Sequence, residues 1–167
     1  MAYFFFLIGP AGCGKSTIAK KIKKKLNIHF FEGDDFHSLK NINKMREGNS
    51  LNFKDRLPWL IRINKKLRKY NHNNKLYIIA CSALKISYRK ILRQDLDNTF
   101  FLYLHCNKKE LVKRNLNRSH FFPSSLIGDQ IKNFENSKDL IKINANQNIV
   151  NVQNIIIKKI RLIVIIT

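Results

Sequence analysis

Cysteine is scarce in this chain, whose 167 residues include only three of them. Cys13, Cys81 and Cys106 are odd in number and far apart, and no two of them form a C-x-x-C pair. A disulfide framework or a zinc site needs paired or closely spaced cysteines, so we expect neither. Thiols that stay reduced are typical of the cytoplasm, where we expect the protein to reside.

Long uninterrupted apolar segments are also missing, which argues against a membrane protein. The opening MAYFFFLIGP lacks a positive leading segment and a small-residue cleavage site, and its apolar run is too short to cross a bilayer. The apolar tail from Val150 onward keeps helical spacing and carries Lys158, Lys159 and Arg161. We expect a first strand, a last helix packed on a sheet, and no membrane partner. A short final strand is the alternative for the tail.

Acidic residues are few, with 11 against 32 basic residues and a formal net charge of +21. Such a charge attracts polyanions, which raises nucleic acid as a partner. Lys, Asn and Ile are over-represented, however, and A+T-rich coding DNA produces this bias without selection for binding. In the run Lys20 to Lys25 the lysines lie opposite Ile18, Ile22 and Leu26, which indicates a solvated helix face. Without a zinc-finger or RNA-recognition motif, we expect no specific nucleic-acid partner.

Short apolar segments alternate with longer segments of helical period, which is typical of βαβ units around a parallel sheet. The chain can bury one sizeable core and is too short for two, so we expect a single domain over residues 1–167. The predicted strands are Tyr3 to Ile8, His29 to Phe31, Leu76 to Cys81, Thr99 to Leu104 and Leu140 to Ile143. The predicted helices are Lys15 to Leu26, Leu39 to Glu47, Pro58 to Tyr70, Leu84 to Gln94, Lys108 to Arg118, Ser124 to Phe134, and Val150 onward.

The segment GPAGCGKST, Gly9 to Thr17, matches the pattern G-x-x-x-x-G-K-[ST] between the first strand and a helix. Its glycines let backbone N–H groups turn inward, and the helix dipole adds positive charge, so the loop suits polyphosphate oxygens. Lys15 is expected to reach the β- and γ-phosphates, and the Ser16 hydroxyl to coordinate Mg²⁺. We expect a nucleoside triphosphate here, bound by Gly9, Ala11, Gly12, Cys13, Gly14, Lys15, Ser16 and Thr17.

The stretch FFEGDDFHS gathers three of the rare acidic residues, Glu32, Asp34 and Asp35. Ligands of a doubly wound sheet bind beyond the carboxyl ends of its strands, so we expect this strand tip beside the phosphate loop. Phosphoryl transfer needs a carboxylate near the attacking hydroxyl, and the strand ends CSALK and HCNKK offer none. Asp34 is the leading candidate for the base, with Asp35 or Glu32 in a supporting or water-mediated metal role. The alternative is that these acids cap a helix starting near Ser38.

The segment GDDFHSLKNINKMREGNSLNFKDRLPWL, Gly33 to Leu60, resembles the substrate segment of gluconokinases, small P-loop kinases that phosphorylate the 6-hydroxyl of D-gluconate. The likeness continues in CSALKISYRKILR, Cys81 to Arg93, and in HFFPSSLIGDQ, His120 to Gln130, so it spans most of the chain. The resemblance implies a three-layer α/β P-loop kinase fold like that of adenylate and shikimate kinases, with a central five-stranded parallel sheet and a helical lid. It also implies ATP and Mg²⁺ as cofactors, D-gluconate as substrate, and a homodimer.

Gluconate is a polyhydroxylated anion, so its pocket needs cationic donors for the carboxylate and mixed donors for the hydroxyls. The fork of Arg56 fits a carboxylate, although an ion pair with Asp55 is the alternative. For Arg89 and Lys85, which are predicted to lie on a helix, the alternative is a position on a solvated helix face. Trp59 has helical spacing to later apolar residues, which favours a core position over a sugar platform. The candidate substrate-binding residues are Asp34, His37, Arg56, Lys85, Arg89 and His120.

The resemblance also implies a lid at about residues 114–124, which contains Arg114, Arg118 and His120. Lid arginines stabilise charge on the transferring phosphoryl group and help to exclude water. We expect Arg114 and Arg118 at the nucleotide, and Arg118 in catalysis with Lys15 and Asp34. Gluconokinases usually have Arg, any residue, Gly, His here, whereas this chain has Arg118, Ser119, His120. The lid is therefore expected to be one residue shorter and to lack its glycine.

Three other functions compete with gluconate phosphorylation. A P-loop kinase could act on another small hydroxylated substrate, such as shikimate or a nucleotide. The basic charge fits a nucleic-acid-binding ATPase, whose binding would have to survive physiological salt. The altered lid fits a decayed enzyme of low activity.

Overall fold

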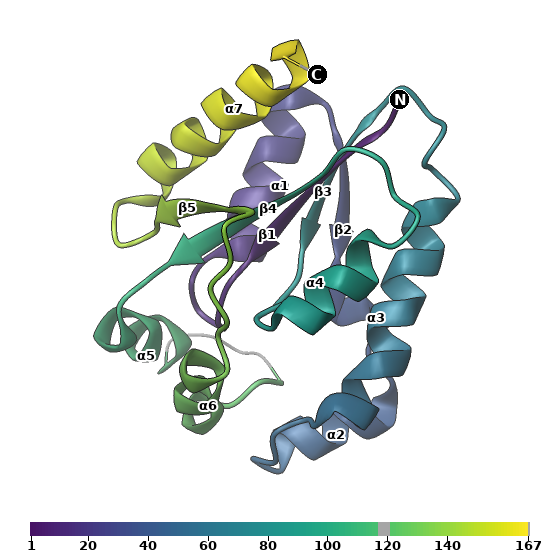
Figure 1. Ribbon diagram of the computed structural model, residues 1–167. Coiled ribbons are helices and arrows are strands. Elements are labelled where there is room, and N and C mark those ends of the chain that lie inside the picture. Colours follow the sequence, from purple (N-terminus) through teal and green to yellow (C-terminus); the bar gives the residue numbers. More distant parts are fainter. Residues whose placement is uncertain (117–120, 167) are drawn as a thin grey trace.

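The computed structural model describes residues 1–116 and 121–166 of the chain. It contains a five-stranded sheet in the order β2-β3-β1-β4-β5, in which every neighbouring pair is parallel (Figure 1). The strands are β1 (Tyr3–Ile8), β2 (His29–Glu32), β3 (Leu76–Ala80), β4 (Thr99–His105) and β5 (Leu140–Asn144). The α-helices are α1 (Lys15–Leu26), α2 (Leu39–Arg46), α3 (Phe53–Arg68), α4 (Ile86–Arg93), α5 (Lys108–Leu116), α6 (Ile127–Lys132) and α7 (Ile149–Ile166), and the 3-10 helices are η1 (Gly33–Phe36) and η2 (Ser124–Leu126).

Strand β1 shows why this sequence builds a sheet that is covered on both sides. Its residues are aromatic or aliphatic at every position and do not alternate with polar ones, as expected for a strand buried on both faces. Phe5 and Leu7 point into one core, and Phe4, Phe6 and Ile8 into the other. Residues that alternate along the strand thus divide between two apolar layers.

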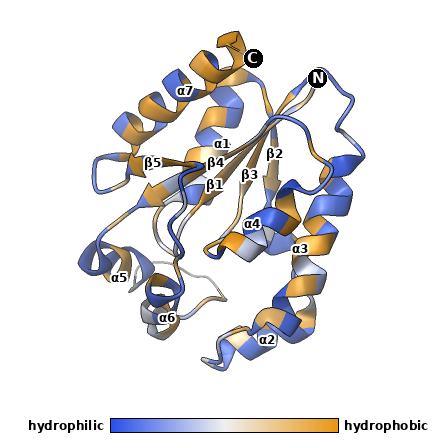
Figure 2. Ribbon diagram, in the orientation of Figure 1, coloured by the Kyte–Doolittle hydropathy of each residue, from blue (hydrophilic) through white to orange (hydrophobic). Residues whose placement is uncertain are grey.

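The helices cover the sheet as two outer layers (Figures 1 and 2). Helices α1 and α7 contribute Ile18 and Ile156 to the core on one face. Helices α3 and α4 contribute Leu60 and Leu92 to the core on the other. The three-layer α/β architecture is therefore confirmed. In the part of the chain that the structure describes, we find no helix with the length and apolarity needed to cross a membrane.

All five predicted strands occur, with bounds shifted by at most a residue at each end. The predicted start of the third helix at Pro58 was wrong, because α3 begins at Phe53 and contains Pro58. A reciprocal capping box starts this helix earlier: the Asn52 side chain accepts from the Asp55 N–H, and the Asp55 carboxylate accepts from the Asn52 N–H.

The helix predicted over Ser124 to Phe134 is divided into η2 and the short α6. The predicted final helix is confirmed as α7, so the alternative of a strand at the tail is excluded. Helices α2, α5 and α6 gather around the carboxyl ends of the strands, where ligands of such sheets bind (Figure 1).

Candidate active site

The phosphate loop joins β1 to α1, and its glycines adopt backbone angles that other residues rarely do. Gly12 has φ 85°. A Cβ atom there would lie 2.2 Å from Nδ2 of Asn115 and 3.0 Å from the Leu111 carbonyl oxygen. Glycine therefore allows the loop to pass close against α5.

Lys15, the cation of the loop, contacts the backbone of the loop itself. Nζ of Lys15 donates to the carbonyl oxygens of Gly9 and Pro10, each at 2.9 Å. Helix α1 begins at Lys15 without a side-chain cap and has no acidic residue in its first turn. Its first N–H groups and its dipole are therefore available to an anion, as the sequence predicts.

Strand β2 is not the neighbour of β1, because β3 lies between them. The two strand tips are therefore not adjacent, but the tip of β2 lies beside the phosphate loop as expected, because the Glu32 carboxylate is hydrogen-bonded to the Ser16 side chain. The 3-10 helix η1 follows β2 and begins close against the end of β3. A Cβ atom on Gly33 would lie 2.5 Å from the Ala80 carbonyl oxygen. Asp34 follows directly and lines the same cavity as Lys15.

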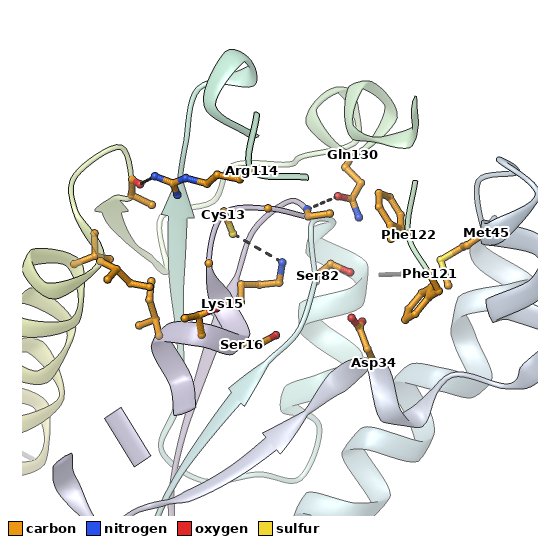
Figure 3. A pocket seen from close by; sticks show the side chains of 18 of the residues that line it. Cys13, Lys15, Ser16, Asp34, Met45, Ser82, Arg114, Phe121, Phe122 and Gln130 are labelled. Atoms are coloured by element: carbon orange, nitrogen blue, oxygen red, sulfur yellow. Dashed lines mark hydrogen bonds between the residues drawn. The ribbon is translucent and has the colours of Figure 1, made fainter. Parts of the chain in front are cut away.

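This cavity has a volume of about 400 Å³ and lies at the carboxyl edge of the sheet. Figure 3 shows Lys15 and Ser16 on one side and Asp34 on the other, with Ser82 between them in the view, Phe121 near Asp34 and Phe122 near Gln130. A second cavity of about 400 Å³ shares four residues with the first and extends to Lys85. The shared residues are Arg56, Ser82, Phe122 and Gln130.

The three clustered acids have separate environments. Burial raises the pKa of the Glu32 carboxyl, and a hydrogen bond from the Ser16 side chain acts in the opposite direction. Asp35 is exposed and does not line the cavity. The cap of α2 is Ser38, whose hydroxyl accepts from the Asn41 N–H at 3.2 Å. The α2 cap thus comes from Ser38, and Glu32 is the acid beside Ser16.

His37 lies flat against Trp59, with ring centroids 4.3 Å apart and an interplanar angle of 11°. Burial lowers its pKa to about 4, and the nearby Asp34 charge only partly opposes this effect. His37 is therefore neutral at pH 7. Its buried Nδ1 has no hydrogen-bond partner among the described residues. A neutral ring of this kind suits a substrate hydroxyl better than a carboxylate.

Arg56 is a desolvated cation on the wall shared by the two cavities. Its Nε donates to the Leu51 carbonyl oxygen at 3.2 Å, and the guanidinium carbon lies 5.7 Å from the centroid of the Tyr88 ring. Asp55 is not its ion-pair partner, because that carboxylate contacts Nζ of Lys44 at 2.7 Å. Within residues 1–116 and 121–166, Arg56 forms no ion pair.

Arg89 does not join the cavity residues. Its side chain is buried, and its guanidinium donates to the carbonyl oxygens of Ala83, Leu84 and Glu135 and to the Ser137 hydroxyl at 2.6–3.1 Å. The prediction of a substrate contact is thus not supported by its position, because its donors hold backbone carbonyls around α4.

Ala11 also has a different contact from the one expected of a phosphate-loop residue. Its N–H donates to Oε1 of Gln130 at 2.6 Å and is therefore not directed to phosphate in this structure. Sequence reasoning did not single out Gln130, because the two residues are 119 positions apart.

Arg114 lines the first cavity, and its Nε donates to Glu110 Oε1 at 2.9 Å. Arg118 and His120 lie outside the described residues. Sequence reasoning missed the segment after β5, which contributes Ala145, Gln147 and Asn148 to the cavity. The rule that ligands bind beyond strand ends is the signal that could have found it.

Comparisons with known proteins show what this chain is similar to. A family model described as an AAA domain matches residues 8–122. The thermosensitive gluconokinase of Escherichia coli (strain K12) is 37% identical, over 89% of this chain and 82% of the relative. Among solved structures, a gluconokinase from Sinorhizobium meliloti 1021 is 31% identical with a TM-score of 0.79, over 91% of this chain and 87% of that chain. A sugar kinase from Janibacter sp. HTCC2649 is 30% identical with a TM-score of 0.88, over 95% and 94%. The chain belongs to the gluconokinase family of P-loop kinases.

Proposed function

We propose that this protein transfers the γ-phosphoryl group of ATP to the 6-hydroxyl of D-gluconate, giving ADP and 6-phospho-D-gluconate. The observation that carries the proposal is that Lys15, Asp34 and Arg56 line one cavity. These are a phosphate-binding cation, a carboxylate and a second cation that forms no ion pair in the described part of the chain. Together they suit a triphosphate, a hydroxyl and a carboxylate.

The proposed transfer is a direct in-line displacement without a covalent enzyme intermediate. The 6-hydroxyl oxygen forms a bond to the γ-phosphorus while the bond from that phosphorus to the β–γ bridging oxygen breaks, and ADP leaves. Asp34 accepts the hydroxyl proton and later passes it to solvent. Lys15 and the N–H groups at the start of α1 stabilise negative charge on the phosphoryl oxygens. Arg114 and Arg118 are proposed to add positive charge from the lid.

The cavity residues fit the cation that such a reaction requires. Mg²⁺ prefers oxygen ligands and usually keeps several waters, and it offsets phosphate charge when bound. Ser16 offers a hydroxyl at the start of α1, and Glu32 places a carboxylate within hydrogen-bond reach of it. We propose Ser16 as the direct ligand and Glu32 as a residue that orients Ser16 or a metal-bound water.

The acceptor is proposed to occupy the region where the two cavities meet. Arg56 would bind its carboxylate with two parallel hydrogen bonds, and neutral His37 would contact a hydroxyl through Nδ1. Lys85, which lines the second cavity, and His120 are proposed as further contacts of the acceptor.

The test is the formation of ADP and 6-phospho-D-gluconate by purified protein with Mg-ATP and D-gluconate. We expect a robust gluconate-dependent rate and little turnover with shikimate or nucleosides. Asp34→Asn should lower kcat by about 100-fold or more, because general-base catalysis contributes about 10²–10⁴-fold. Asp35→Asn is the matched control, since Asp35 is exposed and outside the cavity. A higher rate with another acceptor, or equal effects of the two variants, would refute the assignment.

Two finer properties are part of the proposal. A cytoplasmic location is supported by Cys13, Cys81 and Cys106, which are buried free thiols. Assembly as a homodimer and the absence of a specific nucleic-acid partner stay predictions, which size-exclusion chromatography with light scattering and salt-dependent binding assays test.

A further inference from the structure

Gln130 connects two parts of the molecule that have different tasks in the proposed reaction. Its side chain belongs to α6 and is only 6% exposed. Oε1 accepts the N–H of Ala11 in the phosphate loop at 2.6 Å (Figure 3). The same residue lines both the cavity of the phosphate loop and the cavity that extends to Lys85. It therefore lies on the boundary between the phosphate site and the proposed acceptor site.

This hydrogen bond settles the orientation of the Gln130 amide. A backbone N–H is a donor only, so the atom that faces Ala11 must be the amide oxygen. The NH₂ group, with two donors, then points to the other side. Among the described residues, Nε2 of Gln130 makes no hydrogen bond, although the side chain is more than nine-tenths buried.

Nε2 is not among the fully buried unpaired atoms of the described residues, so these two donors face the cavities that Gln130 lines and can bind a ligand or water there. The nearby Asp129 carboxylate accepts from the Ser50 hydroxyl at 2.6 Å and the Glu135 carboxylate accepts from the Ile86 N–H at 2.8 Å, and neither accepts from Gln130 in this structure. Beyond Gln130 the shared wall of the cavities offers Arg56 and Ser82. Both are hydrogen-bond donors, and the oxygen atoms of a polyhydroxylated acid would satisfy donors clustered in this way.

We propose that Gln130 is a positioning residue that couples the ATP site to the acceptor site. Its Oε1 holds the phosphate loop through Ala11, and its Nε2 donates to a hydroxyl oxygen of the bound acceptor. When that hydroxyl is bound, the amide is held from both sides and the loop is fixed in the conformation that binds phosphate. The inference rests on the proposed function, because it takes D-gluconate as the acceptor.

Such a role predicts that each ligand strengthens the binding of the other. Coupling between two sites is reciprocal, so D-gluconate should raise the affinity for a non-hydrolysable ATP analogue by the same factor as the analogue raises the affinity for D-gluconate. For coupling through one amide we expect a factor of about 5 to 10, at the lower end of the usual range.

The test measures this factor by calorimetry with Mg²⁺, the ATP analogue and D-gluconate, on the full chain and on two variants. Gln130→Met removes both halves of the contact. Gln130→Glu keeps an oxygen acceptor for Ala11 but removes the NH₂ donors. Both should reduce the coupling factor to about 1, and the charge that the second substitution adds does not affect this result, because the coupling is a ratio of affinities. Lys132→Ala is the control, since Lys132 is exposed on the same helix.

Each outcome decides the inference. Loss of coupling in both Gln130 variants but not in Lys132→Ala supports it. Coupling that survives in either Gln130 variant overturns it, as does a change in melting temperature alone, which would indicate a purely structural contact. Absence of coupling in the unaltered protein also overturns it. Failure of the proposed function is distinguishable, because it appears as no gluconate-dependent ADP formation by the unaltered protein.

Discussion

Trp59 holds the segment that carries Asp34, and replacing it with phenylalanine tests whether that support matters for catalysis. The indole is fully buried, and its Nε1 donates to the Gly33 carbonyl oxygen at 2.7 Å. Gly33 directly precedes Asp34, and the indole also stacks on His37. Phenylalanine keeps an aromatic ring in the core but loses the donor and part of the volume.

The cost of Trp59→Phe has two parts. The smaller ring leaves a cavity, which costs about 1–2 kcal/mol of unfolding free energy by comparison with other large-to-small core substitutions. The Gly33 carbonyl is left without its donor, which costs about 1–3 kcal/mol when such a group is buried. The sum is about 3 kcal/mol. For a protein of this size each kcal/mol lowers Tm by about 2–4 °C, so we expect a decrease of about 6–12 °C.

The kinetic consequence should be confined to the acceptor side of the site. We expect kcat with D-gluconate to fall about 10-fold, because a small displacement of a catalytic group has effects of this size or larger. The KM for ATP should change less than two-fold, since Trp59 does not line the cavity of the phosphate loop.

Urea denaturation and steady-state kinetics measure both effects, with Lys65→Ala, an exposed position of α3, as the control. Unfolding free energy and kcat that both stay at the values of the unaltered protein would refute a supporting role for the indole hydrogen bond. A lower unfolding free energy with unchanged kcat would show that Trp59 belongs to the core alone.

Three further predictions follow from the burial of polar side chains. Arg89→Met should lower the unfolding free energy by about 3 kcal/mol or more, because it leaves several backbone carbonyls without donors, and should leave the KM for D-gluconate nearly unchanged. Arg56→Met should instead raise the KM for D-gluconate about 10- to 100-fold, as expected for loss of a charge-assisted contact. Steady-state kinetics of the two variants test this. A raised KM in Arg89→Met together with an unchanged KM in Arg56→Met would contradict the proposed acceptor site. The lowered pKa of His37, about 4 against an ordinary value of 6.5, means that the unfolded chain binds more protons between these pH values. Stability should therefore be complete above pH 6.5 and decrease as the pH falls toward 4, by about 3 kcal/mol at most, and urea denaturation of His37→Gln should show a smaller dependence over this window.

Much of the fold could be predicted because its signals are local. The apolar run of β1, the phosphate-loop pattern and the lysine-bearing helix α1 are contiguous in sequence, so short-range periodicity was enough to find them. The start of α3 was missed for a local reason too: the Asn52–Asp55 capping box was overlooked in favour of Pro58.

The candidate site was predictable only in part. The phosphate loop and Asp34 were expected at one edge of the sheet, and they line one cavity. The roles of two other residues were not predictable, because they depend on contacts between distant segments. Arg89 donates to Glu135, 46 residues away, and Gln130 accepts from Ala11, 119 residues away.

The sequence by itself determined the chemistry that this protein carries: a loop for polyphosphate, a rare carboxylate cluster after a strand, and apolar segments that require a covered parallel sheet. Patterns of a few neighbouring residues suffice for these, because backbone hydrogen bonding and burial act over short stretches of chain. The tertiary structure alone decided which polar side chains share the cavity and which support it. Insertion of β3 between β1 and β2, the close approach of Gly33 to Ala80 and the burial of Arg89 all arise from packing between elements far apart in the chain.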